Sequence, residues 1–319
     1  MLITGGLITM GPYCEGCPES QIASSAEIYD PKTGKFTPTG SMSTPRSGHT
    51  ATLLQDGRVF VLGGAAFGEI YEPKTGKFTQ TRGPLHNADG SFASTLLTDG
   101  RVLVIGSVVE DPGKCGADAE IFNPATGKFT ETGALLERMC PRELVRLKDG
   151  RVLVVGSNDG VAQSPEIYDP GSGRFGAVVT SRGVGGLDQP TDATLLEDGR
   201  VMIVGSWNQS SRDWIESYDP RTNTLSTVAT SSDAPYDYGL SVLQDGRVLV
   251  VGNLFGEEVF DPRTSTLAPA GLPKLTDDEG GLCDPVGVVL PNGNVLLTGG
   301  EPCGDDISTT YSDAELYIP

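Results

Sequence analysis

The stretch Asp149-Gly-Arg-Val-Leu-Val-Val-Gly156 decides the fold, because the same phrase returns along the whole chain. Its other copies begin at Asp56, Asp99, Asp198, Asp245 and Asn292, at intervals of 43, 50, 49, 47 and 47 residues. Each copy joins an Asp-Gly or Asn-Gly turn to a short, almost entirely apolar and β-branched run. That combination is typical of a hairpin turn that leads into a strand buried on both faces. A period of this length indicates a repeat architecture.

A second phrase, built on Glu, an aromatic residue and Pro, alternates with the first. Its seven copies begin at Ala26, Gly68, Ala119, Pro165, Ile215, Glu257 and Ala314. Six of them continue into a tight turn such as Lys32-Thr-Gly-Lys35 and then a short strand. One more strand precedes each Asp-Gly, as in Thr50-Ala-Thr-Leu-Leu54. Each complete repeat is therefore expected to contain four antiparallel strands, named a, b, c and d in chain order.

Four-stranded units of this size cannot bury both faces alone, and a radial arrangement as a β-propeller buries them with few exposed edges. The repeats give strands b, c and d at the start, five complete units, and strands a, b and c at the end. We therefore predict an all-β fold, a seven-bladed propeller with incomplete terminal blades, as one domain. The expected blades span about 1–42, 43–85, 86–136, 137–184, 185–231, 232–273 and 274–319.

Several features resemble the Kelch repeat. They are the glycine pairs Gly63-Gly64 and Gly299-Gly300, the aromatic residue of strand c, and Pro45-Arg-Ser-Gly-His-Thr-Ala51. The resemblance covers essentially the whole chain and implies the architecture of the galactose-oxidase-like central domain. Only the first, second and seventh units keep both glycines, and most lack the tryptophan common in strand d.

Copper-radical oxidases that resemble galactose oxidase need two His, two Tyr and one Cys around one metal. This chain has only two histidines, His49 and His86, and no cysteine lies near them in sequence. The resemblance therefore implies no convincing copper site. We expect no metal and no other cofactor, apart from a Ca²⁺ ion discussed below.

Composition excludes some classes of partner. The formal net charge of -19 disfavours binding to nucleic acid and docking on anionic lipid. No apolar stretch approaches the roughly 18 residues that a membrane-spanning helix requires. Six cysteines favour an oxidising compartment, so we predict an extracellular or periplasmic protein. Because Met1-Leu-Ile-Thr-Gly-Gly6 matches the second half of the repeated phrase, any export signal is expected upstream. We expect a monomer.

Strand direction assigns every connection to one of two ends of the blades. The a–b and c–d turns share one end, called the turn end; the b–c loops and the connections between blades share the other, called the loop end. The turn end is repetitive, and we expect its basic residues only to terminate strands and favour solubility. These residues are Arg58, Arg101, Arg151, Arg200, Arg247, Lys32, Lys35, Lys74, Lys77, Lys128, Arg174, Arg221 and Arg263.

All six cysteines are expected at the loop end. Pairing Cys115 with Cys140, and Cys283 with Cys303, would join connections that the topology makes neighbours, and Cys14 with Cys17 would form a small local ring. The Cys-x-x-Cys at Cys14 has two alternatives. Half of a zinc site would need two further Cys or His ligands nearby, and a thioredoxin-like redox pair would need a following helix.

The loop end also varies most between blades, and variable loops on a rigid scaffold are where function tends to lie. Alignment of strand a on its turn places His49, Phe92, Arg142, Thr191, Tyr238 and Pro285 at one equivalent position, with Thr50, Ala93, Glu143, Asp192, Gly239 and Val286 next to them. The candidate ligand-binding residues are Arg46, His49, Arg142, Asp192, Asp237, Tyr238 and Asp284, with Glu143 beside them. The alternative is that they only make hydrogen bonds between blades. The Glu of strand c occurs in every blade, so we interpret it as structural, accepting hydrogen bonds where strands b and c meet.

Two functions follow. The first is a non-catalytic binding module whose loop end holds a protein segment or a glycan. Acidic residues crowd that end, including Glu15, Glu19, Asp111, Asp277, Asp278, Glu279, Asp305 and Asp306, which suits a basic partner or a bound Ca²⁺. The second is a cofactor-independent sugar mutarotase or isomerase, with His49 or Glu143 as general base and Arg142 as an anion anchor.

Overall fold

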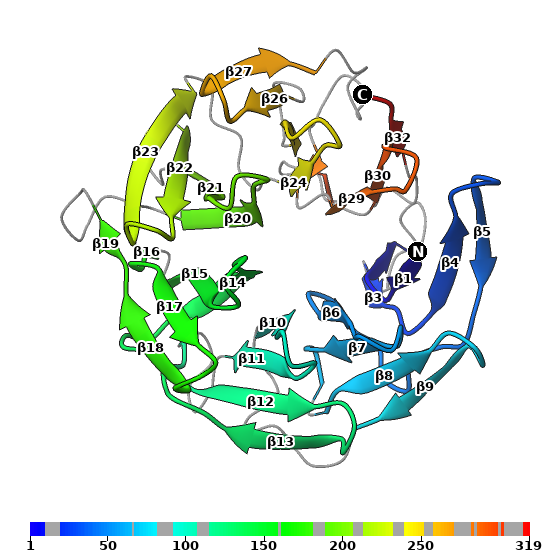
Figure 1. Ribbon diagram of the computed structural model, residues 1–319. Coiled ribbons are helices and arrows are strands. Elements are labelled where there is room, and N and C mark those ends of the chain that lie inside the picture. The colour runs from blue at the N-terminus through cyan, green and yellow to red at the C-terminus, as the bar shows by residue number, and fades with distance from the viewer. Residues whose placement is uncertain are drawn as a thin grey trace. The chain divides into compact units, whose positions relative to one another are not determined.

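The computed structural model describes most of the repeat units. The described residues are 1–9, 20–65, 67–81, 92–106, 115–158, 161–180, 189–206, 213–231, 239–251, 258–270, 282–283, 286–298, 301–302 and 315–319. Every regular element within these ranges is a β-strand, and none of the described residues forms a helix long and apolar enough to cross a membrane. The fold is all-β and belongs to the seven-bladed propeller class, as the repeat predicts (Figure 1).

The described chain divides into two compact units, and unit 1 holds the first four blades. Blade 1 has three strands in the order β1 (Leu2–Thr4), β4 (Ala26–Asp30) and β5 (Lys35–Pro38). Blade 2 contains β6 (Thr50–Leu53), β7 (Val59–Leu62), β8 (Glu69–Glu72) and β9 (Lys77–Gln80). Blade 3 contains β10 (Phe92–Leu96), β11 (Val102–Gly106), β12 (Ala119–Asn123) and β13 (Lys128–Glu131). Blade 4 contains β14 (Cys140–Arg146), β15 (Val152–Asn158), β17 (Glu166–Asp169) and β18 (Arg174–Ala177).

Unit 2 holds the other three blades. Blade 5 contains β20 (Gln189–Leu195), β21 (Val201–Ser206), β22 (Asp213–Asp219) and β23 (Thr224–Ser231). Blade 6 contains β24 (Gly239–Val242), β25 (Val248–Val251), β26 (Glu258–Asp261) and β27 (Thr266–Pro269). Blade 7 has three strands, β29 (Val286–Val289), β30 (Val295–Thr298) and β32 (Glu315–Tyr317). Both terminal blades thus have the three described strands that the repeat count predicts.

Short strands occur outside this plan. They are β2 (Leu7–Thr9), which pairs with β3 (Ser20–Ile22); β28 (Leu282–Cys283), which pairs with β31 (Glu301–Pro302); and β16 (Val161–Ala162). A further one, β19 (Val179–Thr180), runs parallel to β23 and so extends the sheet of blade 5. The repeat pattern does not foresee β19, because its residues carry no copy of either phrase.

The core is built on strand b of each blade, as the apolar phrase predicts. In blade 3 every residue of β11 is buried, and the rings of Phe60 in blade 2 and Phe122 in blade 3 stack with their centroids 4.2 Å apart. Strand c adds an aromatic residue that packs on strand d, as Tyr71 does on Phe78 at 4.9 Å. Burial between neighbouring blades therefore supplies much of the stabilisation.

The Asp-Gly-Arg turns have a structural role, as expected. The Asp149 carboxylate accepts a hydrogen bond from the Arg151 backbone N–H at 3.0 Å and forms an ion pair with its guanidinium at 2.7 Å. Gly150, with φ of 91°, takes the left-handed conformation between them. The same pairs form at Asp56 and Arg58, Asp99 and Arg101, Asp198 and Arg200, and Asp245 and Arg247.

Candidate functional site

The candidate site lies at the loop end, where strand a of each blade begins. Within each unit, polar contacts join strand a of one blade to strand a of the next. In unit 1, the Ser94 hydroxyl of β10 lies 2.6 Å from the Thr52 hydroxyl and 3.2 Å from the Thr50 hydroxyl, both of β6. In unit 2, the Asp192 carboxylate of β20 accepts a hydrogen bond from the Leu240 N–H of β24 at 2.8 Å. The position of Thr50 and Asp192 therefore serves contacts between blades, as the alternative interpretation expects.

Arg46 lies in the connection that leads into blade 2, and its side chain is fully buried. Its guanidinium donates to Glu69 at 3.1 Å, to the Gly63 carbonyl at 2.6 Å and to the Phe67 carbonyl at 2.7 Å. The Glu69 side chain is only 1% exposed. A ligand contact for Arg46 does not fit this geometry, because its donors are satisfied inside blade 2. The arrangement instead anchors the connection to strand c.

Three Glu residues of strand c accept hydrogen bonds, which fits the structural role expected, but not where strands b and c meet. Glu216 accepts from the Thr227 hydroxyl of strand d at 3.3 Å, and the other two accept from a connection between blades. Glu69 accepts from the Ser43 backbone N–H at 2.9 Å, and Glu166 accepts from those of Leu136 at 2.9 Å and Glu137 at 3.1 Å. These donors lie in the connection that leads into strand a of the same blade, and not where strands b and c meet. The sequence does not predict this acceptor site, because the connection varies in sequence and most of its donors are backbone N–H groups, with the Arg46 side chain as an exception.

His49 is partly buried in the same connection of blade 2. Its Nε2 lies 2.7 Å from the Thr4 hydroxyl of β1, and its Nδ1 is buried without a hydrogen-bond partner among the described residues. Burial, and secondarily the charge of Arg46, lower the pKa of the imidazole from its usual value, which favours the neutral form. A buried Nδ1 does not reach a sugar hydroxyl in this arrangement, so the geometry offers little support for His49 as a general base.

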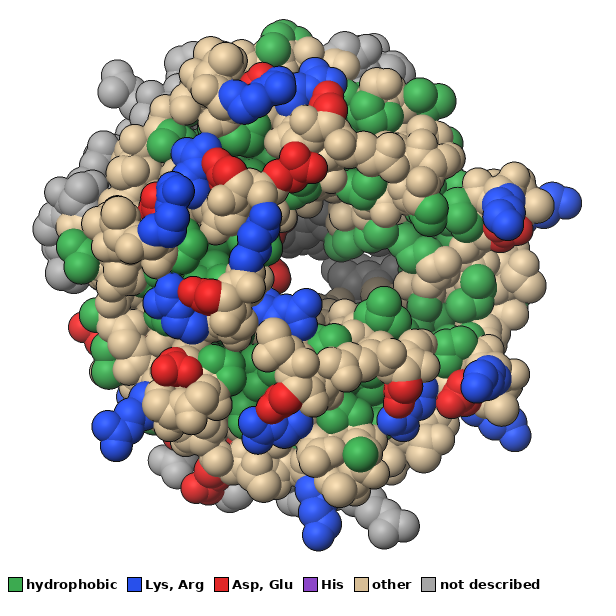
Figure 2. Space-filling view, in the orientation of Figure 1, with side chains coloured by type: hydrophobic (Ala, Val, Ile, Leu, Met, Phe, Trp, Pro, Cys, Tyr) green, Lys and Arg blue, Asp and Glu red, His purple; other side chains and the backbone are tan. Residues whose placement is uncertain are grey.

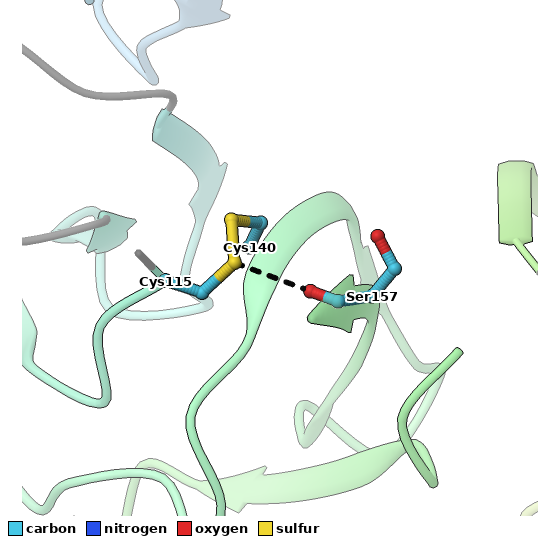
Figure 3. Close-up of a disulfide and its surroundings, with 3 residues drawn as sticks. All are labelled: Cys115, Cys140 and Ser157. Atoms are coloured by element: carbon cyan, nitrogen blue, oxygen red, sulfur yellow. Dashed lines mark hydrogen bonds between the residues drawn. A yellow bond between two sulfur atoms is a disulfide. The ribbon is translucent and has the colours of Figure 1, made fainter. Parts of the chain in front are cut away.

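Arg142 differs from Arg46 in being exposed. The pairing of β14 with β15 shifts register between Pro141 and Glu143, so Arg142 occupies a β-bulge, a feature that can redirect a side chain. The preceding Cys140 forms the predicted disulfide with Cys115, whose sulfur also lies 3.5 Å from the Ser157 carbonyl oxygen (Figure 3). The disulfide joins the b–c loop of blade 3 to the start of β14, and it holds the segment that presents Arg142.

Asp192 is the most strongly perturbed acid described at the loop end. Besides Leu240, its carboxylate accepts from the Ala193 backbone N–H at 2.7 Å. Burial raises its pKa to about 6, although both backbone hydrogen bonds act in the opposite direction. β20 shifts register between Pro190 and Asp192, so blade 5 has a bulge at the same level as blade 4. Because both oxygens of this carboxylate accept backbone hydrogen bonds, one of them from the next blade, it has less hydrogen-bonding capacity for a ligand.

The remaining candidates lie outside the described residues. They are Asp237, Tyr238, Asp284, Cys14, Cys17 and Cys303, together with His86 and the acidic residues proposed for a basic partner or Ca²⁺. Cys283 is described through its backbone, which pairs with Glu301 across β28 and β31. The two further disulfides and the Cys-x-x-Cys alternatives therefore stay predictions.

The described residues do not fit the donor set of a copper-radical oxidase. The sulfurs of Cys115 and Cys140 are bonded to each other, and His49 Nε2 is engaged with Thr4. Within the described part of the chain, no group of three or more His, Cys, Asp or Glu residues is placed to hold a metal ion. These residues therefore assign no role to copper.

Comparison with known proteins supports the fold. No protein family model and no curated protein matches the sequence. A solved structure of a fungal alcohol oxidase of the AA5 family, in complex with copper, is similar with a TM-score of 0.70 and 17% sequence identity. The match covers 92% of this chain and 67% of the oxidase chain. At this identity the likeness concerns the fold alone, and it supports the β-propeller fold of this chain.

Proposed function

We propose that this chain is a non-catalytic binding module whose loop end holds a protein segment or a glycan. The observation that carries the proposal is the contrast between two arginines at that end. Arg46 is buried and donates to protein groups, whereas Arg142 is exposed on a bulge next to a disulfide. An exposed guanidinium on a segment that a disulfide holds suits recognition, because less backbone conformational entropy is lost when a ligand docks.

The placement of His49, the residue expected as a general base, also favours binding over catalysis. Its Nε2 is used in a contact between blades, with the Thr4 hydroxyl at 2.7 Å. The solved oxidase of similar fold is an enzyme with copper, but the described residues here do not fit that donor set. The disulfide is consistent with an extracellular location, where a binding module of this type would meet glycans or exposed protein segments.

A printed glycan array, followed by titration of any glycan that is bound, tests the proposal. We expect Arg142→Gln to weaken binding about tenfold through loss of a charged hydrogen bond. Arg146→Gln is the matched control, because Arg146 is also exposed but lies at the other end of β14, where it donates to the Leu96 carbonyl at 2.9 Å. An equal loss in the two variants would contradict a site at the loop end.

The sugar isomerase alternative is tested on the same proteins by NMR exchange between aldose anomers. The binding proposal expects exchange at the uncatalysed rate for the wild-type protein and for His49→Gln alike. Catalysed exchange that is lost in His49→Gln or Glu143→Gln would overturn the proposal in favour of the enzyme.

A further inference from the structure

The turn end of the blades contains a second charged surface that the proposed function does not use. Figure 2 shows Lys and Arg side chains projecting from the face in view, many of them beside Asp or Glu. The arginines of the Asp-Gly-Arg turns belong to such pairs, as at Asp149 and Arg151. The c–d turns do not all follow this rule, and the two units differ there.

In unit 1, a basic residue opens strand d in every blade. Lys35, Lys77, Lys128 and Arg174 are the first residues of β5, β9, β13 and β18, and all four side chains are exposed. Lys32 and Lys74 add a second exposed base to the turns of blades 1 and 2. None of these six side chains forms an ion pair with a described residue. We call this set the lysine rim: Lys32, Lys35, Lys74, Lys77, Lys128 and Arg174.

The acidic residues of these turns are engaged with backbone donors. The Asp30 carboxylate accepts from the Lys32 N–H at 3.0 Å and from the Thr33 hydroxyl at 2.9 Å. The Glu72 carboxylate accepts from the Lys74 N–H at 3.1 Å. These carboxylates stabilise the turn, and among the described residues neither forms an ion pair with a neighbouring ammonium group.

In unit 2, the same turns are closed by ion pairs. Arg221 forms two hydrogen bonds with Asp219, at 3.0 and 2.8 Å, and Arg263 forms two with Asp261, at 3.1 and 2.9 Å. The residue that opens strand d is Thr224 or Thr266 instead of a base. The turns 30–35, 72–77, 123–128 and 169–174 of unit 1 thus carry six basic and three acidic residues, whereas 219–224 and 261–266 carry two of each.

Contacts with the neighbouring blade hold the rim turns in place. The Gly76 carbonyl, next to Lys77, accepts from Gly40 N–H at 3.0 Å, and the Gly173 carbonyl, next to Arg174, accepts from Gly133 N–H at 2.9 Å. In blade 3 the Pro124 carbonyl accepts from the Arg58 guanidinium at 3.2 Å. The turns of blades 2, 3 and 4 that carry these cations are therefore each bonded to a neighbouring blade.

We propose that the lysine rim binds a linear acidic polysaccharide, at the opposite end of the blades from the ligand site proposed above. Cations distributed over four consecutive blades match a chain that repeats its charge, whereas a small anion would contact only one turn. Lys ammonium groups on flexible stems suit carboxylates or sulfates that are spaced along such a chain. The net charge of -19 repels every polyanion, and it repels nucleic acid more than a polysaccharide whose charges are more widely spaced. The disulfide is consistent with the compartment in which acidic polysaccharides occur.

Binding of the intact protein to immobilised polygalacturonate at low ionic strength tests the rim. The double variant Lys35→Gln and Lys77→Gln is expected to bind about tenfold more weakly, because each exposed charge pair contributes about 0.2–1 kcal/mol. The control is Arg221→Gln with Arg263→Gln, which removes the same charge from the paired turns of unit 2 and is expected to leave the affinity unchanged. Adding salt should weaken wild-type binding more than binding of the rim variant.

Three outcomes would overturn the proposal. They are absence of binding to polygalacturonate, an equal loss in the two double variants, and binding to polyglutamate as strong as to the polysaccharide, which would identify an acidic protein segment as the ligand. The proposed function stands or falls separately, because Arg142→Gln should leave polygalacturonate binding intact.

Discussion

Blades 2 and 4 use different interactions to hold the equivalent connection, the segment that leads into strand a of each blade. Arg46 and Met139 each lie ten residues before the Asp of their turn, and each donates its backbone N–H to an equivalent carbonyl, Ala23 at 3.0 Å and Gly116 at 2.9 Å. Both side chains are fully buried. Blade 2 fastens the connection with the Arg46–Glu69 ion pair, whereas blade 4 places a thioether there and adds the Cys115–Cys140 disulfide.

The difference shows how one position in a repeat changes the chemistry of another. Glu166 keeps the backbone donors that its counterpart Glu69 has, but Met139 offers it no positive charge. Burial accordingly raises the pKa of Glu166 above its usual value, even though the Leu136 and Glu137 N–H groups lower it. The equivalent carboxylates of blades 2 and 4 therefore have different charged neighbours, a guanidinium at Glu69 and only backbone N–H groups at Glu166.

Arg46→Met should have the largest effect on stability. It gives blade 2 the methionine that blade 4 has at the equivalent position, Met139. We expect a loss of about 3–5 kcal/mol in the free energy of unfolding, because Glu69 becomes a buried charge without a cation. Urea denaturation measures it. Adding Glu69→Gln to the variant should recover part of the loss, since the unpaired charge is removed. A loss below about 1 kcal/mol would contradict the role given to the ion pair.

Removing the disulfide tests how blade 4 stabilises the connection that leads into its strand a. The Cys115→Ala and Cys140→Ala double variant should lose about 3–4 kcal/mol, as a chain-entropy model gives for a crosslink of 25 residues. The reduced wild-type protein should behave alike in denaturation. Hydrogen exchange should become faster first around Gly116 and Met139, whose backbone bridge lies next to the crosslink. Faster exchange confined to blade 2 would count against this assignment.

Blade 5 extends the comparison to a carboxylate that bonds the next blade. The folded pKa of Asp192, about 6, exceeds the ordinary value of 3.8 for this side chain, so the folded state binds the proton more tightly than the unfolded state does. Stability should therefore fall as pH rises from about 4 to about 6, by about 1–3 kcal/mol. Asp192→Asn should remove this part of the pH dependence while keeping one acceptor for Leu240. Identical pH profiles for the two proteins, measured by thermal unfolding, would refute it.

Glu166→Gln tests the difference between Glu166 and Glu69, and it should have the smallest effect on stability of these variants. Because the folded pKa of Glu166 is raised, its contribution to stability is greatest while it is protonated and declines as the pH rises through that pKa. The variant should therefore unfold at a slightly higher temperature than the wild type at neutral pH, and should show no difference in acid. The opposite order at neutral pH would mean that the carboxylate is stabilised by its backbone donors.

Much of the fold follows from local pattern. The Asp-Gly-Arg turn, the apolar strand after it and the Glu-aromatic-Pro phrase each specify backbone geometry within a few residues, so seven units and their incomplete ends are readable from the chain. The Cys115–Cys140 pair was also predictable, because the topology places the two connections together. The position of the Glu69 and Glu166 acceptors was not, because most of their donors are backbone groups in connections of unrelated sequence.

The candidate site shows the same limit more clearly. The sequence does not distinguish Arg46 from Arg142, since both are arginines expected at the loop end. Only packing buries Arg46 against Glu69 and leaves Arg142 exposed on a bulge. Arg221 and Arg263 likewise pair with the acid two residues earlier, whereas no side chain of the lysine rim forms an ion pair with a described residue.

The sequence by itself determined the repeat, the strand order and the two chemically distinct ends of each blade, because turns and alternating burial depend on neighbouring residues. The tertiary structure decided which charges outside the turns are paired, buried or exposed, because the Arg46–Glu69 pair and the burial that raises the pKa of Asp192 depend on groups that are distant in the chain and are brought together only by folding.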